Sequence, residues 1–392
     1  MVHINHRNIV IKIMENSEKL IVIPQDFQLP ESLELDCGKT LDNAVLRYET
    51  LGTLNEDKSN AILICHALSG DAHVAGFHSG EDRKPGWWDD FVGSGKAIDT
   101  DKYFVICSNV IGSCAGSTGP RTINPATGKM YNMEFPVITI RDMVRAQKYL
   151  IDSLGIKKLL SVLGGSMGGM QAMEWAINYP DNIASCVPIA TTSQLSPQSI
   201  AFDWVGREAI KYDPNYNSGN YSSDLPPSSG LATARMLAHI TYLSDESMLK
   251  KFGRNLQENQ DYSFNFARDF AVESYLEHQG QRFVERFDAN SYFYITRAMD
   301  YFDLAARHGN DLTNAFQYCK NIKFLVVAFS SDWLFPTSQS IEITRALIKN
   351  EIEVSFSEIE SSYGHDAFLL EIDALGEMVS SFLNNVMKKL EA

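Results

Sequence analysis

The sequence predicts an α/β fold in which a mostly parallel central sheet is flanked by helices. Two observations carry this prediction: short, nearly continuous apolar runs recur along the first half of the chain, and segments with helical periodicity separate them. Such runs are typical of strands buried on both faces, because neither face of the strand then needs polar residues. Four runs precede residue 192, at 61–65, 103–107, 159–163 and 186–190.

An amphipathic helix is predicted between two of these strands. Residues 141–154 (RDMVRAQKYLIDSL) repeat their apolar positions with helical spacing, and Gly155 follows as a stop signal. A strand–helix–strand order of this kind places parallel strands side by side in one sheet.

The strand pattern ends near Thr192 and does not return before about Asn310. Helical segments dominate this interval, for instance 231–242 and 266–278, and a polar loop runs through 212–230. We therefore expect residues 193–310 to form an inserted helical lid.

The α/β pattern then resumes with an apolar run at 323–329 and a second strand segment at 353–356, and it ends in a helix at 373–390. This division predicts a core domain built from residues 20–192 and 311–392. Residues 1–19 are expected to be a peripheral N-terminal extension.

Charge and composition exclude several classes of function. The net charge of −15 and the absence of a dense Lys/Arg run argue against binding to nucleic acid. No apolar stretch is long enough to cross a bilayer, and Lys12 interrupts the first apolar run, so we expect a cytoplasmic protein without a signal peptide. The six cysteines lack metal-type spacing and are expected to be reduced thiols.

A nucleophile motif follows the apolar run at 159–163. Gly164-Gly165-Ser166-Met167-Gly168 has the form G-x-S-x-G and precedes a helical run at 170–177. In a strand–turn–helix context this motif lifts the serine hydroxyl above the end of the sheet, and it indicates the α/β-hydrolase fold with Ser166 as nucleophile. The alternative is a glycine-rich phosphate loop or a simple tight turn.

A nucleophilic serine needs a base and a carboxylate, which follow the serine along the chain in this fold. His365 is the one histidine beyond His308. Asp332 directly follows the apolar run at 323–329, where a triad carboxylate belongs, although it could instead be a helix N-cap. Three other carboxylates, Asp303, Asp311 and Glu351, fit less well because they lie on helical or pre-strand segments.

Two backbone N–H groups are predicted to form the oxyanion hole: those of Met167, after the nucleophile, and Leu68, in the loop after an early strand. His66 precedes the nucleophile and is expected to orient this loop. The spacing of His73 and His78 matches no metal motif, so these two histidines are interpreted as surface loop residues, and no metal or permanently bound cofactor is expected.

Beyond these features, the sequence resembles the homoserine O-acetyltransferases from about residue 20 to the end. The resemblance rests on long local matches: HALSGDAH (66–73), GWWD (86–89), NVIGSCAGSTGP (109–120), FPVITIRDMVRAQ (135–147), LGGSMGGMQ (163–171), ARMLAHITYLS (234–244), RFDANSYFYITRAMD (286–300), SDWLFP (331–336) and GHDAFL (364–369). It implies an α/β-hydrolase core with a helical lid, and transfer of acetyl from acetyl-CoA to L-homoserine in methionine biosynthesis.

The resemblance also implies roles for single residues. The family's triad falls on Ser166, Asp332 and His365, and its substrate-binding residues fall on Arg235 and Asp366. Arg235 would bind the substrate carboxylate and Asp366 the ammonium group. From the sequence alone Arg235 could equally form an ion pair on a helix surface, and Asp366 could be a loop cap.

Leu334 bears on the acyl donor. Succinyl-using members of the family carry an arginine two positions after the triad aspartate, where this sequence has Leu334, so acetyl-CoA is the expected co-substrate. The alternatives are a succinyl-CoA-using homoserine or serine acyltransferase, an esterase or thioesterase with the same triad, and a non-enzymatic binding module. The resemblance implies a homodimer formed through the lid helices.

Overall fold

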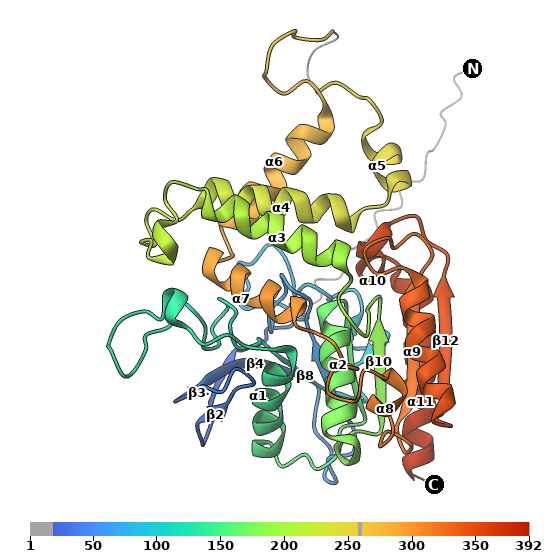
Figure 1. The fold of residues 1–392 in the computed structure, drawn as a ribbon. Coiled ribbons are helices and arrows are strands. Elements are labelled where there is room, and N and C mark those ends of the chain that lie inside the picture. Colours follow the sequence, from blue (N-terminus) through green and yellow to red (C-terminus); the bar gives the residue numbers. More distant parts are fainter. Residues whose placement is uncertain (1–18, 258–260, 392) are drawn as a thin grey trace, which may run out of the picture.

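The computed structural model describes residues 19–257 and 261–391, so the expected N-terminal extension lies outside the described residues except for Lys19. An eight-stranded sheet forms the centre of the molecule (Figure 1). From edge to edge its strands are β1 (Gln25–Gln28), β4 (Val45–Leu51), β8 (Phe104–Ser108), β5 (Ala61–Cys65), β9 (Ser161–Gly165), β10 (Ser185–Ile189), β11 (Lys323–Phe329) and β12 (Val354–Ile359).

The sheet is mostly parallel, as predicted. β4 runs antiparallel to both of its neighbours, and every other pairing is parallel. Parallel strands end at the same edge, so the segments after β5, β9, β11 and β12 meet at one edge of the sheet, where ligands bind in open α/β folds.

Helices cover both faces of the sheet. One face packs against α1 (Ile140–Ser153), α2 (Met167–Asn178) and α9 (Thr337–Lys349), and the other packs against α11 (Ile372–Glu391). β5 serves both layers, because Leu63 lies in the first core and its neighbours Ile62 and Ile64 lie in the second.

The chain between β10 and β11 is helical. It contains α3 (Pro197–Lys211), α4 (Ser228–Tyr242), α5 (Asp245–Phe252), α6 (Ala271–Val284), α7 (Ala289–Asp300) and α8 (Leu312–Ala315). α4 packs between α3 and α6, and Figure 1 shows these helices lying across one end of the sheet. Among the described residues of this segment, none adds a strand to the central sheet.

Two short strand pairs lie outside the main sheet, β2 (Leu33–Glu34) with β3 (Thr40–Leu41) and β6 (Val92–Gly93) with β7 (Ile98–Asp99). The remaining elements are α10 (Ala367–Leu370) and four single turns of 3₁₀ helix, namely Asn132–Glu134, Pro180–Asn182, Asn217–Gly219 and Gly364–Asp366. None of the described helices is both long and apolar enough to cross a membrane. All six cysteines are free thiols, four of them buried.

Several boundaries differ from the predicted ones, and polar capping explains one of them. The helix predicted at 266–278 begins only at Ala271, because the Glu273 carboxylate accepts hydrogen bonds from the N–H groups of Asp269 and Phe270. Helix α3 lies in the predicted helical insertion but was not singled out, although Ser196 caps it by accepting from Ser199 N–H and Pro197 occupies its first position.

Candidate active site

Ser166 lies on a tight turn between β9 and α2, and its backbone is held in an unusual conformation. Its φ and ψ angles are 58° and −124°, a region that residues other than glycine rarely adopt. The Ser166 N–H donates to Ile189 O at 2.9 Å, and the Thr191 hydroxyl donates to Ser166 O at 2.8 Å. The neighbouring strand β10 and the residues after it therefore fix the strained turn from the side.

Two glycines of the motif are required by the close approach of strand β5. A Cβ atom added to Gly164 would lie 2.4 Å from the carbonyl oxygen of Cys65, and one added to Gly168 would lie 2.1 Å from the same oxygen. Any side chain at these positions would push the turn away from β5. The glycine spacing of the motif thus has a steric cause.

Asp332 and His365 come together at the same edge of the sheet, after β11 and β12. His365 Nδ1 lies 2.7 Å from Asp332 Oδ2, and both side chains are buried. The other carboxylate oxygen, Oδ1, accepts hydrogen bonds from the N–H groups of Leu334 and Phe335. Asp332 therefore caps its own turn and orients the imidazole, but it is not a helix N-cap, because the next helix, α9, begins at Thr337 after Pro336.

Burial and the Asp332 carboxylate have opposite effects on the pKa of His365. Burial alone would lower the pKa of the imidazole, but the negative charge and hydrogen bond of Asp332 outweigh it, and the pKa is raised above 6.5. A hydrogen bond at Nδ1 leaves Nε2 as the free nitrogen, the arrangement of a general base.

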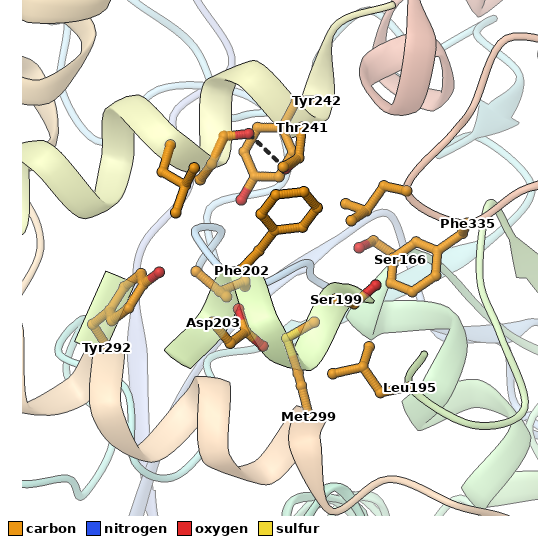
Figure 2. A pocket seen from close by; sticks show the side chains of 14 residues that line it. Ser166, Leu195, Ser199, Phe202, Asp203, Thr241, Tyr242, Tyr292, Met299 and Phe335 are labelled. Atoms are coloured by element: carbon orange, nitrogen blue, oxygen red, sulfur yellow. Dashed lines mark hydrogen bonds between the residues drawn. The ribbon is translucent and has the colours of Figure 1, made fainter. Parts of the chain in front are cut away.

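Aromatic residues connect His365 to the surroundings of Ser166. Phe335 lines the same cavity as Ser166 (Figure 2). The Phe335 ring centroid lies 5.1 Å from that of His365. Phe368 packs 5.7 Å from His365 and fills the space beside Gly165. Within the described residues Ser166 Oγ makes no hydrogen bond, and hydrogen bonds between catalytic groups often form only when substrate binds.

A small cavity of about 50 Å³ opens at Ser166. Leu334, the residue interpreted as setting the acyl donor, lines this cavity together with Leu68. Figure 2 shows Ser166 and Phe335 on one side of it and Asp203, Met299 and Tyr292 on another. The lining is mainly apolar, so the space beside the nucleophile suits a short uncharged acyl group.

The predicted oxyanion donors flank the serine. Met167 is the first residue of α2, whose N-terminal N–H groups lack partners within the helix. His66 is buried; its Nε2 accepts from Val110 N–H at 3.1 Å, and its Nδ1 lies 2.8 Å from Ala67 O. Burial lowers the pKa of His66. Its two contacts connect the start of the loop that carries Leu68 to the segment after β8.

Arg235 lies on α4 and faces a second hollow next to the loop of Leu68. Its guanidinium lies over the rings of Phe283 and Tyr242 and makes a long 3.4 Å hydrogen bond to Ser69 Oγ. It forms no ion pair with a carboxylate in the described part of the chain. The helix-surface ion pair considered from the sequence is therefore not formed there.

Asp366 lies at the start of α10, directly after His365. Burial raises the pKa of this carboxyl, and the positive charges of His365 and Arg235 counteract the effect only in part. Because the charge of Arg235 affects this pKa, the Asp366 carboxyl and the Arg235 guanidinium are close enough to interact electrostatically. The two residues carried over from the resemblance thus lie near each other and near the histidine.

Sequence reasoning missed two charged residues at the site. Arg286 lines the hollow of Arg235 and donates to Ser69 O at 2.7 Å. Asp203 lines the cavity of Ser166, where burial and the neighbouring Asp300 raise its pKa well above the usual range. Arg286 belongs to the matched stretch at 286–300, which was the one available signal; Asp203 lies on helix α3, which was not singled out.

Comparisons with known proteins indicate the same fold and a family. A family model described as alpha/beta hydrolase fold matches residues 60–372. The homoserine O-acetyltransferase of Methanohalobium evestigatum is 58% identical over 361 residues, which cover 92% of this chain and 73% of that protein. The crystal structure of homoserine O-acetyltransferase from Bacillus anthracis superposes with a TM-score of 0.87 at 33% identity, covering 93% and 98% of the two chains. A crystallised esterase reaches 0.85 at 32% identity, covering 93% and 100%.

Proposed function

The chain belongs to the homoserine O-acetyltransferases, a family of α/β-hydrolase-fold enzymes, and from that premise we propose how its residues transfer acetyl from acetyl-CoA to the hydroxyl of L-homoserine. The products are O-acetyl-L-homoserine and CoA. The transfer proceeds through an acetyl ester of Ser166, in two half-reactions that share one base.

In the first half-reaction His365 Nε2 takes the proton of the Ser166 hydroxyl, and Oγ attacks the thioester carbonyl. The N–H groups of Leu68 and Met167 stabilise the oxyanion. The carbon–sulfur bond then breaks, and His365 returns the proton to the sulfur of CoA. Asp332 supports the transient imidazolium because its carboxylate faces Nδ1.

In the second half-reaction the homoserine hydroxyl takes the place of CoA. His365 removes its proton, the oxygen attacks the acetyl carbonyl, and the ester bond to Ser166 breaks as the proton passes to Oγ. Arg235 binds the substrate carboxylate, since no carboxylate of the described chain occupies it, and Asp366 binds the ammonium group.

The choice of acetyl-CoA as donor is supported by the cavity beside Ser166. Leu334 lines this cavity and offers no charge to a succinyl carboxylate, and a buried unpaired carboxylate costs several kcal/mol. A short apolar cavity of about 50 Å³ is compatible with a methyl group. Acetyl-CoA is therefore the proposed donor.

The observation that carries the proposal is the paired Asp332–His365 unit at the same sheet edge as the strained Ser166 turn. CoA release from acetyl-, propionyl- and succinyl-CoA is measured with homoserine, with serine and with neither acceptor. The proposal expects fast release only with acetyl-CoA and homoserine together. Equal release without an acceptor would favour hydrolysis.

Hydrolysis is the second candidate because a crystallised esterase shares this fold closely, at 32% identity. The same triad can transfer an acyl group to water. Helices α3, α4 and α7 contribute to the lining of the cavity and limit the access of water to the acyl-enzyme. We expect acetyl-homoserine formation to exceed acetate formation, which product analysis by chromatography measures directly.

We further propose that the enzyme is a homodimer assembled through its lid helices. Trp204 and Val205 on α3 and Ile240 on α4 are large apolar side chains exposed on this segment. Exposed apolar residues grouped on one segment are typical of an interface. Light scattering on the purified protein tests the mass of the particle.

A further inference from the structure

A buried carboxylate and two imidazoles meet away from the catalytic residues. Glu49 lies on β4 with its side chain only 2% exposed. Its Oε2 lies 2.8 Å from His73 Nδ1, and its Oε1 lies 2.7 Å from His78 Nε2. The two imidazole rings pack on each other with centroids 3.7 Å apart.

The surroundings of Glu49 favour a positive charge. Within the described residues neither lysine nor arginine forms an ion pair with Glu49. Arg47, two residues earlier on the strand, pairs with Asp26 instead. The Asp71 carboxylate accepts from the His73 N–H at 2.9 Å, and the Asp82 carboxylate accepts from the His78 N–H at 2.9 Å, so two further negative charges lie beside the cluster. A buried carboxylate needs compensation by a cation or by several hydrogen bonds.

We propose that Glu49, His73 and His78 bind one zinc ion. Two imidazole nitrogens and one carboxylate oxygen form a ligand set that zinc commonly takes, whereas Mg²⁺ and Ca²⁺ prefer oxygen ligands alone. The three donor atoms lie within 4.8 Å of one another. In a tetrahedral site with bonds of about 2.0–2.1 Å, donors are roughly 3.3 Å apart, so small side-chain shifts suffice.

The fourth zinc ligand is water. The His78 side chain is 44% exposed, so solvent reaches the cluster from this side. The Glu49 side chain is buried on the opposite side of the cluster. A site with three protein ligands and one solvent ligand is open on one side.

The proposed zinc site connects the loop after β5 to strand β4 of the sheet. His73 and His78 follow Leu68 and Ser69 in the segment after β5, whereas Glu49 belongs to β4. His73 also lines the hollow that contains Arg235 and Arg286. A zinc ion at this position fixes the loop that forms one wall of that hollow, and metal binding thereby stabilises the fold.

The sequence spacing of His73 and His78 had not indicated a metal site. The reason is that the third ligand, Glu49, lies 24 residues before His73 and belongs to strand β4, whereas both histidines lie in the segment after β5. Without zinc the same contacts are two imidazole N–H groups donating to one carboxylate, so the two states differ in whether a metal or two protons join the groups.

Zinc binding to the full-length protein tests the proposal. ZnCl₂ is titrated in competition with a chromophoric chelator, and the metal retained after dialysis is measured by mass spectrometry. Cys37, an exposed thiol, is replaced by serine in every sample, and His3 and His6 by glutamine, so that these groups cannot bind the metal.

The expected result is one equivalent of zinc with a higher thermal midpoint, and visible ligand-field bands of a four-coordinate ion when Co²⁺ replaces it. Both His78→Gln and Glu49→Gln should weaken zinc binding by at least about tenfold, since each removes a ligand. The control His278→Gln changes an exposed histidine on α6 and should leave zinc affinity unchanged.

Three results would overturn the proposal. These are zinc binding no tighter than that of the His78→Gln variant, equal loss of zinc in the His278→Gln control, or Mg²⁺ and Ca²⁺ competing with zinc at equal concentration. Because His78 is partly exposed, His78→Gln should fold normally, and circular dichroism confirms that its binding result reports on the metal site.

Discussion

His365 Nδ1 and Asp332 Oδ2 lie 2.7 Å apart between two almost completely buried side chains. The Asp332 carboxylate raises the pKa of His365 although burial acts in the opposite direction. The arrangement leaves one imidazole nitrogen free for the proposed role of general base, which requires the neutral form of His365.

The first prediction concerns the pH dependence. His365 accepts a proton only when it is neutral, so kcat/KM for acetyl-CoA should fall as pH drops through the raised pKa, with a midpoint above 6.5. Asp332→Asn removes the charge that raises this pKa, and the remaining burial lowers it. The midpoint should therefore move to lower pH, and kcat should fall on the order of 10⁴-fold.

The control for this pH prediction is Glu351→Gln, which changes an exposed carboxylate just before β12, the strand that precedes His365. Its pH profile should match that of the wild type. If the midpoint of the fall in kcat/KM at low pH is the same in Asp332→Asn as in the wild type, His365 is not the group being titrated.

The second prediction concerns backbone strain at Ser166. Because its φ is 58°, Ser166→Gly should relieve strain and raise the free energy of unfolding by about 1 kcal/mol relative to Ser166→Ala. Both variants should lose acyl transfer, since both lack the hydroxyl. Urea denaturation measures the difference, and a glycine variant less stable than the alanine variant would contradict the inferred strain.

The third prediction concerns Arg235. Arg235→Ala should lower kcat/KM for homoserine roughly 30-fold, because the substrate carboxylate loses its charged partner. This corresponds to a loss of about 2 kcal/mol in transition-state stabilisation. The rate of the first half-reaction should change much less. Arg282→Ala, on the exposed side of α6, is the matched control. Equal losses in both half-reactions would make Arg235 a structural residue.

Much of the site could be predicted because its residues follow strands. Ser166, Asp332 and His365 follow strands β9, β11 and β12 respectively, and parallel strands bring such positions to one edge of the sheet. Local sequence signals therefore sufficed to predict these three residues together.

Residues on the helical insertion could not be placed in the same way. Asp203 borders the cavity of Ser166 only because α3 packs above the sheet, and its neighbour Asp300 comes from α7. Glu49 meets His73 across β4 and the segment after β5. Such contacts depend on packing between distant segments, which periodicity within one segment does not report.

The fourth prediction concerns the acyl donor. Wild type should prefer acetyl-CoA over succinyl-CoA by at least about a hundredfold in kcat/KM, equivalent to about 2.7 kcal/mol. Leu334→Arg places a positive charge in the cavity beside Ser166 and should shrink this ratio. Leu334→Met is the uncharged control. If the wild-type kcat/KM values for acetyl-CoA and succinyl-CoA differ by less than about threefold, Leu334 does not determine the choice of acyl donor.

The acetyl ester of Ser166 is the central claim, and mass spectrometry of the enzyme mixed with acetyl-CoA alone tests it most directly. After rapid acid quench and digestion, the peptide containing Ser166 should carry one acetyl group in the wild type and none in Ser166→Ala. Addition of homoserine before the quench should remove the label and yield acetyl-homoserine. Label on another residue such as Cys114, or turnover without any labelled intermediate, would contradict the account.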